Sequence, residues 1–219
     1  MQKSYLIKSD TMKIIIKKPG VLIQAVCMWC LLTLSTTPAQ AGNEEAVAVV
    51  ENLHTILLDN MKTSDSHGYR ERYESISPFI EQNFDLDLIV KVILSRYWNK
   101  FSEDQKTRFI ELFKQLTVAT YASRFVEFKN EKFVTISVDP LKKGRLLIKT
   151  EILAEGEDPV RLDYLMHQRD GRWLIISVVA NGVNDLSLKR AEYGTIIKDQ
   201  GYDDLVRQLK EKIQQYESS

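Results

Sequence analysis

The sequence predicts an α+β domain, because its apolar pattern changes from a helical to a strand period along the chain. Residues 44–128 carry apolar side chains three and four positions apart, whereas residues 133–180 alternate with a period of two. Turn signals such as Asp170-Gly171 divide the second region into hairpins. We therefore expect a four-stranded, twisted antiparallel sheet wrapped by helices, cone-like, with an apolar interior pocket.

The first 41 residues have the pattern of a secretory signal peptide. Five lysines precede an apolar run over Val21–Leu34, and Ala-Gln-Ala at 39–41 forms a cleavage site. The apolar run is short for a membrane span, which favours cleavage over an uncleaved anchor. Met12 is an alternative start, because the lysines that follow it would supply the basic region. We expect one domain, residues 42–219, located in the periplasm.

Charge and residue usage exclude several function classes. Removal of the leader would leave 25 basic and 29 acidic residues, a net charge of about −4, so nucleic acid is not an expected partner. Both cysteines, Cys27 and Cys30, lie in the leader without a lipoprotein box, and the domain thus lacks disulfides, as suits a periplasmic protein. The three histidines are scattered, so we expect no metal site and no cofactor.

Residues 102–128 predict the helix around which the domain is organised. Ser102 and Gln105 form a capping box, and two acidic residues in the first turn suit the helix dipole. The aromatic-rich stripe that follows, as far as Phe128, has to be buried. It is either a core face packed on the sheet, or a core face that also walls a cavity for an apolar ligand. Periodicity does not separate the two.

Capping residues, apolar periodicity and turn residues predict the other helices and strands. Asp85 is the expected N-cap of a short helix through Tyr97 that is apolar almost all round and should be buried on more than one side. The last strand, 172–180, is apolar on both faces and therefore central, and Asn181-Gly182 is expected to end the sheet. The remaining elements are expected at 44–62, 133–138, 145–155, 160–169, 186–199 and from 203 onward.

The predicted interior has few polar groups on its walls. A site for a sugar or an amino acid needs converging hydrogen-bond donors and acceptors, which these walls do not offer. The pattern instead indicates acyl chains or another lipid. The candidate lipid-binding residues are Val90, Leu94, Tyr97, Trp98, Phe109, Phe113, Leu116, Tyr121, Leu162 and Tyr164.

Two other function classes remain open. In a cone-like fold, an Asp163 base and a Tyr164 donor could isomerise enolisable ketones. Strand alternation argues against this enzyme, because it points Tyr164 into the pocket with Leu162 and Met166, and Asp163 toward solvent. The third class is a ligand-free adaptor with a filled core. We expect a binding protein and no enzyme.

The chain resembles the MlaC family of periplasmic lipid-binding proteins over about residues 44–215. The order and spacing of several short pieces carry the resemblance, and these are Tyr97-Trp98, Ser102–Gln105, Phe109–Phe113, Thr120–Ala122, Trp173, Asn181–Val183, Ser187-Leu188, Tyr193, Gly201, Leu205-Val206 and Leu209. Two departures are an insertion at Asn184–Leu186 and Gly194, where the family commonly has Arg. The form of this segment is closer to the hopanoid-cluster branch (HpnM).

The resemblance implies a soluble shuttle that takes part in outer-membrane lipid asymmetry. Such a protein carries a phospholipid, or a hopanoid-like lipid, with its tails in a pocket between sheet and helices. Its implied partners are an inner-membrane ABC transporter complex and an outer-membrane lipoprotein/porin complex. The carrier itself needs neither cofactor nor nucleotide.

Overall fold

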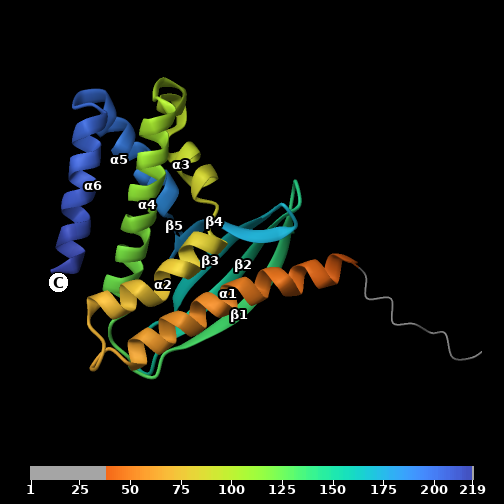
Figure 1. Cartoon of the computed structure of the whole chain (residues 1–219). Coiled ribbons are helices and arrows are strands. Elements are labelled where there is room, and N and C mark those ends of the chain that lie inside the picture. The colour runs from red at the N-terminus through yellow and green to blue at the C-terminus, as the bar shows by residue number, and fades with distance from the viewer. Residues whose placement is uncertain (1–37, 219) are drawn as a thin grey trace, which may run out of the picture. The chain divides into compact units, whose positions relative to one another are not determined.

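The computed structural model describes residues 38–218, with side chains from residue 42 onward. The predicted leader, with both cysteines, therefore lies outside the described residues, apart from the backbone of residues 38–41. Helix α1 begins at Pro38, before the expected cleavage site, which stays a prediction. Helices form one side of the described part and an antiparallel sheet forms the other (Figure 1).

Within the described residues, five helical segments precede the sheet. Their bounds are α1 (Pro38–Lys62), α2 (Tyr69–Asn83), α3 (Leu86–Leu94), the 3-10 helix η1 (Ser95–Lys100) and α4 (Glu103–Arg124). The capping box of α4 is present, since the Ser102 hydroxyl accepts from the Gln105 N–H at 3.1 Å and the Gln105 side chain accepts from the Ser102 N–H at 3.0 Å. Helix α3 is shorter than expected, because the chain turns at Ser95 (φ 49°) into η1. Helix α4 also ends early, at Arg124 instead of Phe128.

The sheet has five strands in the order of the sequence, one more than predicted. They are β1 (Lys132–Leu141), β2 (Arg145–Leu153), β3 (Val160–Arg169), β4 (Arg172–Ala180) and β5 (Val183–Asn184). Asp170 and Gly171 have φ angles of 53° and 74°, which confirms the predicted hairpin. Asn181 and Gly182 adopt similar angles, 48° and 79°, so they turn the chain back as a short fifth strand instead of ending the sheet.

Strand β1 is the outer edge of the sheet and it is irregular. The register shifts between Thr135 and Ser137, and Ile136 between them is 56% exposed. We expected Asp139-Pro140 to mark a connection, but β1 continues to Leu141. Proline is tolerated there because an edge strand does not need every N–H for pairing.

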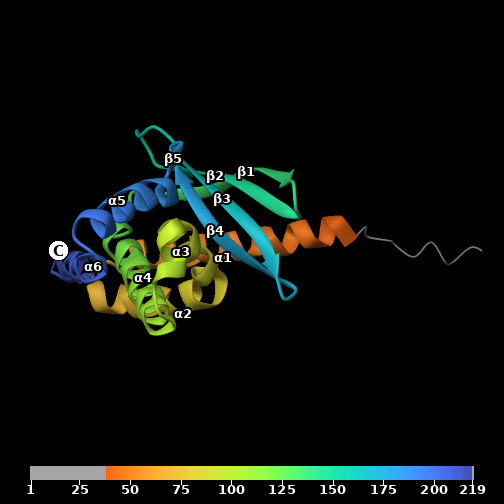
Figure 2. The ribbon, with the colours of Figure 1, turned by 90° about the horizontal axis from the view of Figure 1, so that it is seen from above.

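The long helix that lies against the sheet is α1, not α4. Figures 1 and 2 show α1 running across one face of the sheet, and its Leu53 and Leu57 are fully buried. Helix α4 packs mainly on α2 and α6 (Tyr202–Glu217), so the expected packing of the central helix on the sheet is wrong. Periodicity showed that α4 buries a wide face, but the partners of that face are other helices.

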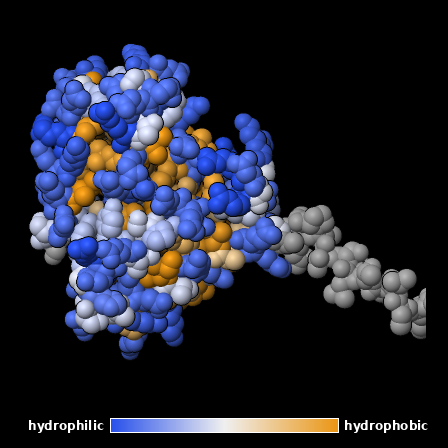
Figure 3. All heavy atoms as spheres, viewed as in Figure 1, coloured by the Kyte–Doolittle hydropathy of each residue, from blue (hydrophilic) through white to orange (hydrophobic). Residues whose placement is uncertain are grey.

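Two helices close the chain. Helix α5 (Asp185–Asp199) packs on α3 and β4, and after Gly201 (φ 95°) helix α6 packs on α4. Strand β4 is buried on both faces, as predicted. In the view of Figure 3, apolar residues reach the surface between the helices, whereas the outer sides of the helices are hydrophilic.

Asp85 ties the start of α3 to the sheet. Its carboxylate accepts from the Leu88 N–H at 3.1 Å as the predicted N-cap, and it also contacts His167 Nε2 and Arg169 at 2.7 Å each. Its own N–H donates to the Ile175 carbonyl at 3.0 Å. Asp85 is only 1% exposed, and the three partners of its carboxylate, one backbone N–H and two side chains, therefore replace the water that the charge has lost.

Two substitutions of Asp85 test whether this residue anchors α3 to the sheet. One removes only its charge, and the other also removes the N-cap. We expect Asp85→Asn to lower the free energy of unfolding by about 1–3 kcal/mol, because Asn keeps the cap but loses the charge on two hydrogen bonds. Asp85→Ala should cost about 1 kcal/mol more, the usual value of a cap. Urea denaturation measures both. Asp87→Asn is the control, because this exposed residue lies 3.6 Å from the same Arg169; equal stability of Asp85→Asn and the unmodified chain would contradict the anchor.

Candidate functional site

Two adjoining cavities lie beside helix α3. One, of about 400 Å³, lies between α3, η1 and α5. The other, of about 220 Å³, lies between α3, α5 and the face of the sheet turned away from α1. Ser187 and Arg190 line both, so we treat the two as one α3–α5 groove, with an upper and a lower cavity. Its size is that of a ligand pocket, for which about 300–1,000 Å³ is usual.

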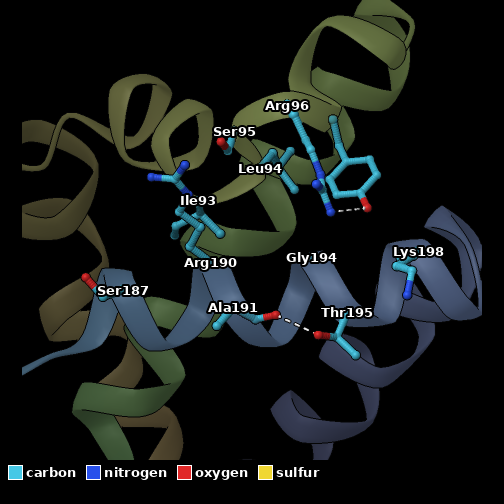
Figure 4. A pocket seen from close by; sticks show the side chains of 11 residues that line it. Ile93, Leu94, Ser95, Arg96, Ser187, Arg190, Ala191, Gly194, Thr195 and Lys198 are labelled. Atoms are coloured by element: carbon cyan, nitrogen blue, oxygen red, sulfur yellow. Dashed lines mark hydrogen bonds between the residues drawn. The ribbon is translucent and has the colours of Figure 1, made fainter.

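The groove exists because bulky side chains on α3 face small ones on α5. The upper cavity has Ile93 and Leu94 of α3 on one side, and Ala191 and Gly194 of α5 on the other (Figure 4). Tyr97 of η1 also lines it. Apolar residues dominate the lower cavity, and they are Leu88, Ile89, Val92, Leu165, Ile176 and Leu186. These residues form the apolar floor of the groove, whereas six polar or charged side chains are part of the lining of the upper cavity.

Four cationic side chains also line the groove, and no carboxylate is among its lining residues. They are Arg96, Arg145, Arg190 and Lys198. Arg96 donates to the Tyr97 hydroxyl at 3.2 Å, and Arg190 points from α5 toward α3 (Figure 4). Cations over an apolar floor give the groove a positive potential and suit an amphipathic anion.

The structure places the ten predicted lipid-binding residues in two environments. Leu94 and Tyr97 line the groove, and Leu94 is at the same time a buried core residue. The other eight belong to the core or pack against it, and they are Val90, Phe109, Phe113, Leu116, Leu162 and Tyr164, all buried, with Trp98 and Tyr121, partly buried. Contact of any of the ten residues with a ligand stays a prediction.

A buried polar pair lies between α1 and the sheet. His54 Nε2 is 3.1 Å from the Tyr164 hydroxyl, and the His54 ring stacks on Phe133 with 4.0 Å between ring centroids. Burial lowers the pKa of His54 to about 4 and raises the pKa of Tyr164. Both groups are therefore neutral at pH 7.

The proposed isomerase pair is not brought together. Asp163 and Tyr164 are consecutive on β3 and point to opposite faces, as alternation predicts. Asp163 is not turned to solvent as expected, since it is 8% exposed and Arg161 pairs with it at 2.8 Å. Within residues 38–218, no group of three or more His, Cys, Asp or Glu side chains is placed to hold a metal ion. None of the helices in that range is long and apolar enough to cross a membrane.

Most groove residues were missed at the level of sequence, although α5 carries a signal for them. Small residues recur on one face of this helix at helical spacing, at Ser187, Ala191, Gly194 and Thr195, with Arg190 among them. A helix face with small residues leaves space where it meets a bulky neighbour. Ser177 of β4 and Arg145 of β2, which line the lower cavity, gave no comparable signal.

Comparison with known proteins now identifies the family. The family model described as MlaC protein matches residues 50–211. The chain belongs to the MlaC family. The resemblance stated from the sequence is thereby confirmed at the level of the family, and the hopanoid branch stays a prediction.

Relatives and a solved structure agree with membership of the MlaC family. The toluene tolerance protein ttg2D of Pseudomonas putida is 25% identical over 178 residues, which cover 78% of this chain and 79% of that protein. The intermembrane phospholipid transport system binding protein MlaC of Haemophilus influenzae is 24% identical over 56% of this chain and 59% of its own length. A phospholipid-binding protein from Ralstonia solanacearum, solved in complex with a phospholipid, has a TM-score of 0.66 at 21% identity, covering 81% of this chain and 98% of that chain. This last likeness confirms the α+β fold.

The buried His54 predicts how the stability of this MlaC-family chain depends on pH. Its pKa is about 4 when folded against 6.5 when unfolded, so the unfolded chain binds more protons between these values. The neutral, buried His54 therefore contributes to the free energy of unfolding in full above pH 6.5. As the pH falls to 4, the free energy of unfolding should decrease by up to about 3 kcal/mol. Urea denaturation between pH 7 and 4 measures it.

The variant His54→Gln isolates this effect. It should show a smaller loss of stability on acidification, because the substituted residue does not titrate. His67→Gln, at an exposed histidine of the α1–α2 connection, is the matched control. An identical pH slope for His54→Gln and the unmodified chain would contradict the assignment.

Proposed function

We propose that this protein is a periplasmic lipid carrier. It holds the acyl chains of a phospholipid or a related lipid and moves that lipid between an inner-membrane ABC transporter complex and an outer-membrane lipoprotein/porin complex. The observation that carries the proposal is the match of the MlaC family model to residues 50–211. The names of the Haemophilus influenzae and Ralstonia solanacearum proteins, which refer to phospholipid transport and binding, support it.

The α3–α5 groove supports the same proposal in physical terms. Its apolar floor can take hydrocarbon, and its cationic lining can face a polar headgroup. Two acyl chains hold about 30 methylenes, and moving each methylene from a membrane into water costs about 0.8 kcal/mol. The free energy of a lipid in water is therefore more than about 20 kcal/mol above that of a lipid in a membrane. A carrier that recovers most of this free energy makes transfer between two membrane complexes nearly thermoneutral. It needs no nucleotide of its own.

The ten candidate residues fit this proposal in two ways. Tyr97 can touch a lipid in the groove as it stands, whereas Leu94 lines the groove but is only 1% exposed. The eight core residues, among them Phe113 and Tyr164, would touch one only in a state in which the helices part from one another or from the sheet, because they now fill the space between them.

Mass spectrometry of the purified protein tests the carrier function directly. We expect protein isolated from its native host under native conditions to release lipid on organic extraction, at a lipid-to-protein ratio near one. Protein from the same host that is heat-denatured and washed before extraction is the control for loosely associated lipid. Absence of bound lipid would instead favour the ligand-free adaptor.

Filling the upper cavity tests whether the groove is the site. The place where a Cβ would stand on Gly194 is open apart from a Tyr97 ring carbon at 4.0 Å. We expect Gly194→Leu to occupy the cavity and to lower the retained lipid about tenfold. The variant should still fold, because Leu is a better helix former than Gly by about 0.5–1 kcal/mol. The measurement is the lipid-to-protein ratio, with thermal unfolding to confirm folding.

Gly194→Ala is the matched control for this variant. It gains the same helix propensity but adds a single methyl group, so its lipid content should equal that of the unmodified chain. Full retention of lipid by Gly194→Leu would place the lipid outside the upper cavity.

A further inference from the structure

We propose that Arg190 and Arg145 bind the phosphate of the carried lipid, and that the hydroxyl of Ser177 donates a third hydrogen bond to the same headgroup. This inference rests on the proposed carrier function. It adds which part of the lipid the protein recognises and where, and it makes the carrier selective for lipids that bear a phosphate.

The charge of the groove lining is the first observation. Residues 42–219 contain fewer basic than acidic residues, 25 against 29. The groove reverses this balance, with four cations and no carboxylate among its lining residues. A positive groove in an otherwise negative chain concentrates anions.

The pairing of the cations singles out two of them. Arg96 is occupied by the Tyr97 hydroxyl and ring, and Lys198 lies 3.6 Å from Asp199. Arg190 and Arg145, by contrast, form no ion pair or side-chain hydrogen bond with any residue of the 38–218 range. Both line the lower cavity, and Arg190 also lines the upper one. Guanidinium groups match the oxygens of a phosphate in pairs, which makes them suited to this anion.

Ser177 supplies an independent sign of a ligand. It lines the lower cavity, it is 5% exposed, and its hydroxyl has no hydrogen-bond partner within the described part of the chain. A buried hydroxyl without a partner is unfavourable and uncommon in folded proteins. A phosphate or ester oxygen in the lower cavity would accept its hydrogen bond and remove this penalty.

The position of the phosphate also fits the apolar part of the groove. Arg190 lines both cavities, together with the apolar residues of the lower cavity and with Ile93, Leu94 and Tyr97 of the upper one. A phosphate at Arg190 would therefore leave hydrocarbon next to apolar side chains. A lipid without phosphate could fill the groove but would leave both guanidinium groups unpaired.

Competition between two lipids with identical acyl chains tests the proposal. The full chain without its leader is incubated with vesicles that contain phosphatidylglycerol and diacylglycerol, reisolated, and its lipid is quantified by mass spectrometry. We expect the unmodified chain to prefer phosphatidylglycerol. The double variant Arg145→Gln/Arg190→Gln should retain about tenfold less phosphatidylglycerol and the same amount of diacylglycerol. Ser177→Ala should shift the preference in the same direction by a smaller factor.

Arg207→Gln is the matched control, because this arginine lies on α6 in exposed ion pairs with Asp204 and Glu211, away from the groove. An unchanged lipid preference of the double variant would overturn the phosphate assignment and leave the carrier function intact. Equal loss of both lipids would also overturn it. If the unmodified chain takes up neither lipid, the carrier function itself fails.

A last experiment distinguishes a site for a lipid headgroup from a site for a free anion. Inorganic phosphate is titrated into the lipid-loaded chain, and the retained phosphatidylglycerol is measured. Displacement by phosphate alone at low millimolar concentration would show a site for soluble anions and overturn the headgroup assignment. Retention of the lipid agrees with a phosphate held together with its acyl chains.

Discussion

Helix α3 imposes the main constraint on this structure, because it is apolar on nearly every side and needs cover from several neighbours. Its start is fixed to the sheet through Asp85, and β4, α4 and α5 supply the cover. The cover by α5 is incomplete, since this helix presents small side chains to α3. The groove is the part of α3 that its neighbours leave open. The constraint that builds the core thus also produces the candidate site.

Local signals in the sequence predicted the local structure well. The capping box at Ser102, the N-cap at Asp85 and the hairpin at Asp170 each depend on residues close in sequence, and all three are confirmed. Strand β5 was missed because a pairing of two residues leaves no period to detect. The sequence also did not predict that α1, and not α4, packs on the sheet, and the reason is different. A periodic pattern tells which face of a helix is buried, but not which element covers it.

The candidate site shows a second limit of sequence reasoning. Large apolar residues such as Phe109 and Leu116, predicted as walls, lie in the core of this structure, where such residues fill space, and their contact with a lipid stays a prediction. Open volume occurs where side chains are small, as at Ala191 and Gly194. The charge of the groove was also out of reach, because Arg145 and Arg190 are 45 positions apart in the sequence and only the fold places them on one cavity.

The irregular outer edge of the sheet affects how readily β1 can pair with a strand of another molecule. An edge strand offers unpaired backbone groups to any other strand that it meets, and continuous, regular edges invite stacking of one molecule on the next. In β1 the shifted register around Ile136 and the ring of Pro140 interrupt such an edge. These two features make β1 a poorer partner for a strand of another copy than a regular edge would be.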